Sequence, residues 1–217
     1  MQSQELLKNI ENSITNKKLQ LAIKRCFDLI ISLILFIVLS PLFIILIIWI
    51  RLDSKGEAVF TQTRIGLNGK PFTIYKFRTM VKDADKMFSR DLNRETLDNF
   101  VFQEKEDSRI TKSGKFLRKT SLDEIPQLIN ILKGDMSLIG PRPEIPDIAN
   151  IYNDYEKIRL LMKPGVSGLA QVNGRGNLEL HETIKYDVTY VENFSLWVDI
   201  KIFFKTFKVV LLREGAY

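Results

Sequence analysis

The longest apolar segment of the chain runs from residue 29 to residue 50 and contains no charged side chain. A helix of this length would extend about 33 Å, which is enough to cross the hydrocarbon core of a bilayer. Pro41 lies near its middle, where a proline removes a backbone hydrogen bond and bends or breaks a helix. Ser40 can bond a carbonyl group that the proline releases, so a break here is tolerable in lipid. The pattern predicts a membrane helix interrupted at Ser40 and Pro41.

Basic residues flank this segment on both sides. They are Lys17, Lys18, Lys24 and Arg25 before it, and Arg51, Lys55, Arg64 and Lys70 after it. Because basic flanks favour the cytoplasmic side, a spanning helix would place one of them outside, whereas a segment that turns back keeps both inside. We therefore favour a re-entrant hairpin over residues 21–52, with a simple spanning helix as the alternative.

Residues 1–20 are polar, with apolar positions at helical spacing, and predict a surface or interfacial lead-in helix. After residue 51 the pattern becomes that of a mixed chain. Residues 58–62 and 72–77 predict two strands joined by a turn rich in Gly and Asn at 66–69. The highly charged residues 83–106 indicate solvated helix and loop.

The second half of the chain begins with a helix signal. Ser121 and Glu124 have the S-x-x-E spacing of a capping box and precede an apolar run, so the sequence predicts a helix over 121–133. A turn at 133–135 and a short apolar piece at 136–139 follow. The absence of repeats or low-complexity linkers predicts one α/β domain, helix-rich and of the α+β kind, over residues 53–217.

The C-terminal segment 197–211 has one broad apolar face and a lysine edge. The apolar positions are Trp197, Ile200, Phe203, Phe204, Phe207, Val210 and Leu211, and the lysines are Lys201, Lys205 and Lys208. An interfacial helix has this pattern, with lysines toward anionic headgroups. A buried core helix with one wet face has a similar pattern and is the alternative. We favour the interface.

Composition restricts the chemistry. The chain has 217 residues and a net charge of +6, with one Cys and one His. A single cysteine excludes an internal disulfide, and so few ligands exclude a zinc site or a Cys/His dyad. The positive charge fits nucleic acid, anionic lipid or a small anionic substrate and does not choose among them. Carboxylates, arginines and hydroxyls are left as candidates.

Two adjacent carboxylates, Asp123 and Glu124, start the predicted helix at 121–133. A helix N-terminus stabilises carboxylates and attracts phosphate. Such a pair suits phosphate chemistry, one acid as nucleophile and the other as a ligand to a hard cation such as Mg²⁺. An ordinary capped helix with two solvated acids is the alternative.

Arg142 lies between Pro141 and Pro143, which restrict the backbone beneath a side chain suited to phosphate. A helix-terminating turn is the alternative. The glycine-rich sections 163–168 and 173–176 match no P-loop or dinucleotide fingerprint. Within them Arg175 is a candidate second phosphate contact. The single histidine, His181, fits a surface or packing role better than that of a general base.

Several blocks recur in the same order in one known family. They are Lys24-Arg25-x-x-Asp28, Ser40-Pro41, Tyr75-Lys76-Phe77-Arg78-Thr79-Met80, residues 121–128, Gly140-Pro141-Arg142-Pro143, residues 163–168 and Asp199-Ile200-Lys201. On these blocks the chain resembles the monotopic phosphoglycosyl transferases, a family of bacterial sugar transferases, over about residues 20–212. Such enzymes move a sugar-1-phosphate from a nucleotide sugar to a polyprenyl phosphate. The resemblance also favours the re-entrant hairpin.

The resemblance implies roles in catalysis. Asp123 would attack the sugar-proximal phosphate of a UDP-sugar, giving a covalent phosphosugar and releasing UMP. Glu124 would hold Mg²⁺ and Arg118 would contact the phosphate. The loop that carries Arg142 would belong to the nucleotide-sugar site, and Asp187 would support the metal or Arg118.

It also implies a place in the cell. Asp199 would order the C-terminal helix, while Lys24, Arg25 and Asp28 would meet the lipid phosphate or brace the hairpin. The partners are a UDP-sugar, polyprenyl phosphate and inner-leaflet lipids, at the cytoplasmic face of the bacterial inner membrane. A homo-oligomer is left open, and the product would start a surface polysaccharide.

Two other classes of function are alternatives. A membrane-anchored scaffold without chemistry would leave Asp123 and Glu124 dispensable. A nucleic-acid-binding domain would need a helix-turn-helix, zinc or aromatic RNA-binding pattern, and the sequence shows none. We expect an enzyme and no nucleic acid.

Overall fold

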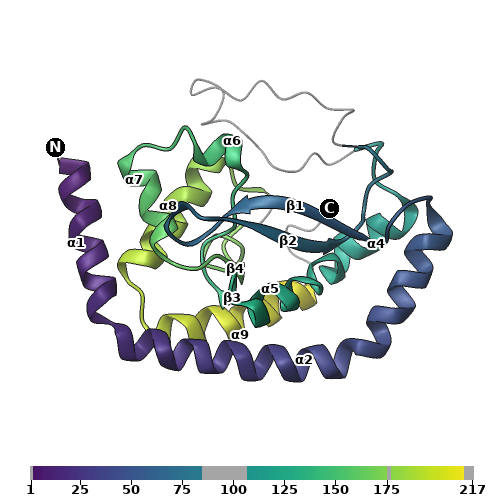
Figure 1. The fold of residues 1–217 in the computed structure, drawn as a ribbon, viewed down its shortest axis with the longest axis horizontal. Helices are drawn as coiled ribbons and strands as arrows, with labels where there is room; N and C mark the ends of the chain where they lie inside the picture. Colours follow the sequence, from purple (N-terminus) through teal and green to yellow (C-terminus); the bar gives the residue numbers. More distant parts are fainter. Residues whose placement is uncertain (1, 85–106, 175–176, 213–217) are drawn as a thin grey trace.

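The structure, a computed structural model, describes residues 2–84, 107–174 and 177–212 (Figure 1). The fold over these residues is mixed and rich in helix, with two small sheets. Most of the charged segment 83–106 lies outside the described residues, and so does Arg175.

The apolar segment lies in one helix, α2 (Lys18–Asp53), which contains Pro41. Figure 1 shows α2 following the base of the molecule and then turning upward along its side. The Ser40 hydroxyl donates to the carbonyl oxygen of Ile37 at 2.8 Å. That carbonyl lies four residues before Pro41 and is the acceptor that a Pro41 N–H would have used. The predicted break is therefore a bend within a continuous helix, because a side chain replaces the missing donor.

Among the described residues, α2 is the one helix long and apolar enough to cross a membrane, and little of it is buried. Helix α1 (Gln2–Asn16) precedes it and buries Ile10 and Ile14 in the largest core cluster. Lys17, between the two helices, donates from Nζ to the carbonyl oxygen of Phe194 at 2.8 Å. The lead-in helix therefore packs against the folded domain.

Strands β1 (Val59–Ile65) and β2 (Pro71–Phe77) form an antiparallel hairpin in which Val59 pairs with Phe77 and Ile65 with Pro71. The turn between them contains a short 3₁₀ helix, η1 (Leu67–Gly69). Asn68 and Gly69 both have positive φ, which Asn and Gly tolerate best. The two strands and the Gly/Asn turn predicted from the sequence are confirmed.

The predicted helix at 121–133 differs from the structure. Ser121 ends helix α4 (Lys112–Thr120) in a left-handed conformation, and its side chain makes no capping bond. Asp123 and Glu124 lie on a single 3₁₀ turn, η2 (Leu122–Glu124), and helix α5 (Gln127–Lys133) begins three residues later. The capping-box prediction was wrong: the Ser121 N–H closes the last turn of α4 by donating to the carbonyl groups of Leu117 and Arg118, so Ser121 ends one helix instead of starting the next.

The second sheet is small and parallel. Strand β3 (Ser137–Ile139) pairs with β4 (Gly165–Ser167), Ser137 opposite Gly165 and Ile139 opposite Ser167. A Cβ on Gly165 would lie 2.1 Å from the backbone nitrogen of Gly140, so only glycine permits this approach. The loop with Pro141, Arg142 and Pro143 leaves the end of β3.

The remaining elements enclose the largest core cluster. They are α6 (Pro146–Ala149), α7 (Asp154–Lys157), η3 (Ile158–Leu161), α8 (Leu180–Glu192) and α9 (Leu196–Leu212). Helix α9 runs alongside α2, and the Nζ of Lys24 and Oδ2 of Asp199 join them at 2.6 Å (Figure 1). Other core side chains lie between α5 and the β1–β2 hairpin.

Helices α2 and α9 carry an apolar surface, which we call the apolar face. Its α9 part includes Trp197, Phe204 and Leu211, which are 62%, 68% and 79% exposed, while Ile202 and Val209 on the same helix are buried. Its α2 part is Phe27, Ile30, Leu33, Ile34, Leu35, Ile37, Val38, Ile44, Ile45 and Ile48. A core helix with one wet face would not expose its aromatic residues, so the structure favours the interfacial interpretation of α9.

Candidate active site

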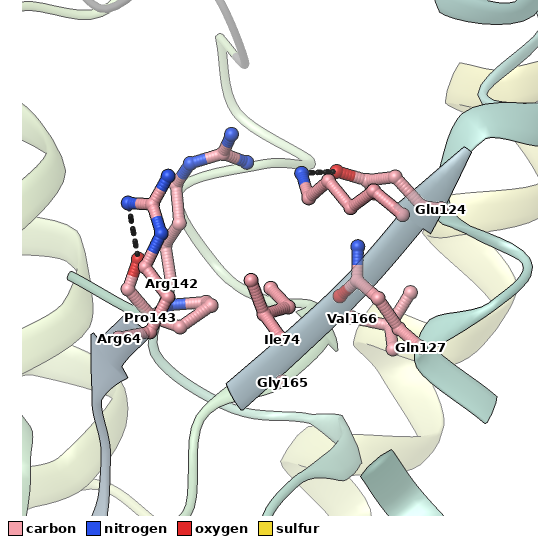
Figure 2. Close-up of a pocket in the computed structure, with 9 residues that line it drawn as sticks. Arg64, Ile74, Glu124, Gln127, Arg142, Pro143, Gly165 and Val166 are labelled. Carbon is pink, nitrogen blue, oxygen red and sulfur yellow. Dashed lines mark hydrogen bonds and ion pairs between the residues drawn. The ribbon is translucent and has the colours of Figure 1, made fainter. Parts of the chain in front are cut away.

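Glu124, the second of the two adjacent carboxylates, faces the β1–β2 hairpin. Glu124 Oε1 accepts from Lys76 Nζ at 2.9 Å, and about a fifth of each side chain is exposed (Figure 2). Lys76 lies on β2, so the pair joins η2 to the hairpin. A partly buried ion pair of this kind fixes the orientation of Glu124 while leaving it open to exchange of partner.

Arg118, in the last turn of α4, lies close to the same turn. Its Nε donates to Thr79 Oγ1 at 3.0 Å. Burial lowers the pKa of the Arg118 guanidinium, and the carboxylate of Asp123 opposes this shift. An arginine remains a cation despite such a shift. Asp123, Glu124 and Arg118 thus line the same region of the structure, and Asp123 is close enough to act on the charge of Arg118.

Arg142 lines a small cavity on the side opposite Gln127 (Figure 2). We call this the Gln127 cavity. Arg64, on β1, lies beside Arg142 and donates from Nη1 to the carbonyl oxygen of Pro143 at 3.4 Å. Figure 2 shows both guanidinium groups on the side of the cavity opposite Gln127. The residues that line the cavity are Arg64, Ile74, Lys76, Glu124, Gln127, Arg142, Pro143, Gly165 and Val166.

A buried arginine holds the peptide of Arg142 in place. Arg159 Nη2 donates to the carbonyl oxygen of Arg142 at 2.9 Å, and Asp187 Oδ2 accepts from the Arg142 N–H at 3.2 Å. Arg159 and Asp187 bond each other at 2.5 Å, and Arg159 Nη1 also donates to Glu144 Oε2 at 3.0 Å. Tyr152 completes this group through its hydroxyl. We call these residues the Arg159 cluster.

The carboxylates and the Gln127 cavity open onto one larger cleft. Its polar end is lined by Arg64, Lys76, Arg118, Asp123, Glu124 and Arg142. Its apolar end is lined by Leu35 and Leu39 of α2 and by Val209 and Val210 of α9. Leu35 and Val210 also belong to the exposed hydrophobic surface. The cleft thus reaches from the carboxylate pair to the apolar face.

A sequence profile of bacterial sugar transferases matches residues 19–213. The chain belongs to the bacterial sugar transferase family. This sugar transferase is 42% identical over 217 residues to the undecaprenyl-phosphate galactose phosphotransferase of Salmonella typhimurium, an alignment covering 98% of the chain and 45% of that protein. It is 37% identical over 208 residues to the UDP-glucose:undecaprenyl-phosphate glucose-1-phosphate transferase of Klebsiella pneumoniae, covering 92% and 42%.

A third relative, the uncharacterized sugar transferase EpsL of Bacillus subtilis, is 41% identical over 193 residues, which is 89% of each chain. The sugar transferase therefore spans less than half the length of the first two relatives and most of the third.

Lys24, Arg25 and Asp28, at the start of α2, all bond to other segments of this sugar transferase. Lys24 donates to the Ile139 carbonyl at 2.8 Å besides pairing with Asp199. Arg25 donates to the Ile131 carbonyl at 2.6 Å, at the C-terminal end of α5. Asp28 accepts from the Leu138 N–H at 3.0 Å. These contacts favour bracing of α2 over a direct role for the three residues in binding lipid phosphate.

The structure also corrects the expected surroundings of Asp187. The Asp187 side chain is fully buried and contacts Arg159 and the Arg142 backbone. The family resemblance had implied support of the metal or of Arg118 instead. Asp187 acts on the site through the Arg142 loop. His181 is exposed, and its Nδ1 lies 3.3 Å from Oε2 of Glu179. It therefore has the surface position that the sequence predicted.

Sequence reasoning missed four side chains of the site: Arg64, Lys76, Gln127 and Arg159. Lys76 and Gln127 stand within blocks that carried the family resemblance, so their positions gave a usable signal. Arg64 was counted only as a flanking charge of the membrane segment, and Arg159 stood in no motif. Their contacts come from segments far apart in the chain.

The donor set near Asp123 suits Mg²⁺ shared with a substrate. Within the described part of the chain, no group of three His, Cys, Asp or Glu side chains forms a metal cage. Magnesium in phosphoryl-transfer sites is usually held by one or two carboxylates together with substrate phosphates and water. Adjacent carboxylates at an open cleft provide this, so the residues fit the ion.

Proposed function

We propose that this sugar transferase moves a sugar-1-phosphate from a UDP-sugar to undecaprenyl phosphate, releases UMP, and so starts a bacterial surface glycan. The observation that carries the proposal is the cleft, whose polar end holds Asp123 and Glu124 among four cations and whose apolar end reaches α2 and α9. A polar donor and a lipid acceptor require such a combination. Two of the relatives are named for transfer to undecaprenyl phosphate, which supports the choice of substrates.

Asp123 acts as the nucleophile. Its carboxylate oxygen attacks the phosphorus that carries the sugar, and the bond from this phosphorus to the bridging oxygen breaks, so that UMP leaves with the bonding pair. An oxygen of undecaprenyl phosphate then attacks the same phosphorus and releases the Asp123 carboxylate. A phosphate monoester has a second pKa of about 6, so it needs little help from a general base near neutral pH.

Neighbouring side chains neutralise and position the phosphates. Arg118 is placed beside Asp123 to stabilise the negative charge that develops on the transferred group. Glu124, released from Lys76, would hold Mg²⁺ with the donor phosphates. The bound ion would supply charge neutralisation of the diphosphate. Lys76 would then be free to contact a phosphate oxygen.

The apolar face is the basis for placing the enzyme at a membrane. We propose that α2 is re-entrant, that α9 lies in the interface, and that both hold residues 53–217 at the cytoplasmic face of the inner membrane. The support is the bend of α2 at Pro41, the basic residues on both flanks of its apolar segment, and the exposed aromatic residues of α9.

Trapping the covalent intermediate tests the mechanism. Purified protein in detergent with Mg²⁺ and a UDP-sugar labelled in the sugar, without lipid, should retain label on the protein and release about one UMP per active site. Hydroxylamine should cleave the acyl phosphate. Asp123→Asn should neither label nor turn over, because an amide is a poor nucleophile, and EDTA should prevent labelling.

Asp147→Asn is the matched control, since Asp147 lines the same cleft away from η2. It should label like the wild-type protein. UMP release that requires lipid, with no adduct after rapid quench, would replace the covalent mechanism by direct transfer. Transfer by the Asp123→Asn protein at the wild-type rate would remove Asp123 from catalysis. Absence of transfer by the wild-type protein supplied with UDP-sugar, lipid and Mg²⁺ would instead favour a non-catalytic scaffold.

A further inference from the structure

Gln127, the first residue of α5, is buried yet lacks a partner on one side of its amide. The side chain is 2% exposed, and its Nε2 makes no hydrogen bond in the protein. Figure 2 shows the amide facing the Gln127 cavity, below the Lys76–Glu124 pair. A buried donor without an acceptor is unfavourable and rare in folded proteins. It indicates that something else supplies the acceptor.

The charges around the cavity specify what kind of acceptor fits. Arg64, Lys76 and Arg142 line it, against the single carboxylate of Glu124. Arg64 is held by Pro143 and by Gln62 Oε1, at 2.8 Å, and the Arg142 backbone is held by the Arg159 cluster. Three positioned cations and a neutral amide donor suit an anion with several acceptor oxygens and more than one negative charge, as in a phosphate monoester.

Asp123 does not line this cavity, although it is adjacent in sequence to Glu124, which does. Under the proposed function the sugar-bearing phosphorus stays with Asp123, so the group next to it is the phosphate of the departing nucleotide. UMP leaves as a phosphate monoester and carries close to two negative charges at neutral pH.

We propose that the Gln127 cavity binds the phosphate of the leaving nucleoside monophosphate, and that Gln127 Nε2 donates to one of its oxygens. Gln127 is thereby a substrate-contacting residue of the donor site. The inference rests on the proposed function for the choice of UMP. Its recognition chemistry, a phosphate monoester held by three cations and an amide, stands on the cavity alone.

Equilibrium binding tests this without turnover. Isothermal titration of the full chain in detergent, with EDTA present to exclude metal-mediated contacts, would compare UMP, uridine and inorganic phosphate. The wild-type protein should bind UMP at least tenfold more tightly than uridine. Gln127→Met keeps the length of the side chain and removes the amide, so it should weaken UMP binding about tenfold or more and leave uridine unchanged.

Gln20→Met is the matched control, because Gln20 also has a buried amide oxygen without a partner and does not line the cleft. It should bind UMP like the wild-type protein. Arg64→Gln is a second test that leaves α5 intact, and it should weaken UMP and inorganic phosphate together. Thermal unfolding of each variant identifies a loss of fold, in which case Arg64→Gln decides the question.

Each result of these binding experiments either supports or overturns the inference. Unchanged UMP affinity in a folded Gln127→Met protein means that water satisfies the amide and overturns the inference, as does equal affinity for uridine and UMP. Inorganic phosphate that competes with UMP supports it. Loss of UMP binding in Gln127→Met, together with absence of any adduct on Asp123, would leave the phosphate site standing and refute the proposed mechanism alone.

Discussion

At the scale of single residues, Arg159 explains how a charge is kept in the interior. Its side chain is 1% exposed, yet its donors reach Asp187, Glu144 and the carbonyl of Arg142. A buried cation is tolerated when such partners compensate for lost hydration. The same bonds fix a backbone loop at the cleft, so the cluster stabilises the fold and positions Arg142 at once.

The Arg159 cluster predicts how donor binding depends on pH. Burial raises the pKa of Asp187 to about 6, so the carboxyl takes up a proton as the pH falls from 7 to 5. Protonation removes the charge that holds Arg159 and the Arg142 N–H, and the loop should loosen. We expect the KM for UDP-sugar to rise several-fold over this range, measured from initial rates of UMP release.

Asp187→Asn lacks this titration. Its KM should be raised at pH 7 and nearly constant between pH 7 and pH 5. Asp154→Asn, at a surface pair with Lys157, should retain the wild-type profile. Parallel pH profiles for Asp187→Asn and the wild-type protein would show that another group is responsible.

The candidate residues divide according to how local their signal is. Asp123, Glu124 and Arg142 were found because each stands in a short motif with its own chemistry, whereas Arg118 was found through the family resemblance. Arg159 was not found, since it bonds Glu144 and Asp187, 15 and 28 residues away, and nothing in either neighbourhood marks the pairing. Buried ion pairs between distant segments depend on tertiary packing, which periodicity does not encode.

At the scale of elements, the prediction succeeded where one local pattern decides the outcome. The β1–β2 hairpin follows from β-type runs and a Gly/Asn turn. The helix at 121–133 was misplaced because an S-x-x-E pattern resembles a start whether or not the serine is already engaged as the end of α4. At Pro41 the sequence predicted both the missing N–H and a bond from Ser40 to a released carbonyl group. The bond from Ser40 to Ile37 confirms the second prediction, and the helix stays continuous where an interruption was expected.

The bend in α2 gives a prediction about topology. In a Cys26→Ser background, Lys18→Cys and Lys55→Cys place one cysteine at each end of α2, and both should be shielded from a membrane-impermeant thiol reagent in intact cells. Adding Pro41→Leu restores an N–H donor and removes the ring clash, so it should straighten α2 and favour a spanning arrangement. In that variant one of the two cysteines should become labelled.

Ser40→Ala is the companion change, because it removes the hydroxyl that replaces the missing donor. It should retain shielding of both cysteines, since the proline still bends the helix. Labelling of one cysteine in the protein that retains Pro41 would establish a spanning helix and rule out the re-entrant arrangement.

At the scale of the whole molecule, the same two helices carry the apolar face and line one end of the cleft. α2 carries exposed aliphatic residues, α9 carries exposed aromatic ones, and the cleft ends between the two helices. The Lys24–Asp199 pair, with side chains only 8% and 12% exposed, holds these helices together. The relation between face and cleft could not be read from the sequence, where the two helices lie more than 140 residues apart.

This arrangement predicts how α9 contributes to membrane attachment. Phe204→Glu with Phe207→Glu places charge on the exposed aromatic side, which should disfavour burial in lipid. Flotation with liposomes of anionic lipid should show less bound protein, while thermal unfolding in detergent stays close to wild type because both side chains are exposed. Lys201→Glu with Lys208→Glu should weaken binding only at low salt. Unchanged flotation of the phenylalanine variant would assign attachment to α2 alone.

The apolar end of the cleft also bears on how the enzyme meets its two substrates. Under the proposed function, a protein held flat by α2 and α9 would keep one orientation, so the lipid acceptor would reach Leu35 and Val210 by lateral diffusion in the plane of the membrane. The nucleotide sugar would arrive from the aqueous phase, at an entrance lined by cations. The rate of the second step should therefore follow the number of acceptor lipids per unit area, and dilution of the aqueous phase should leave it unchanged.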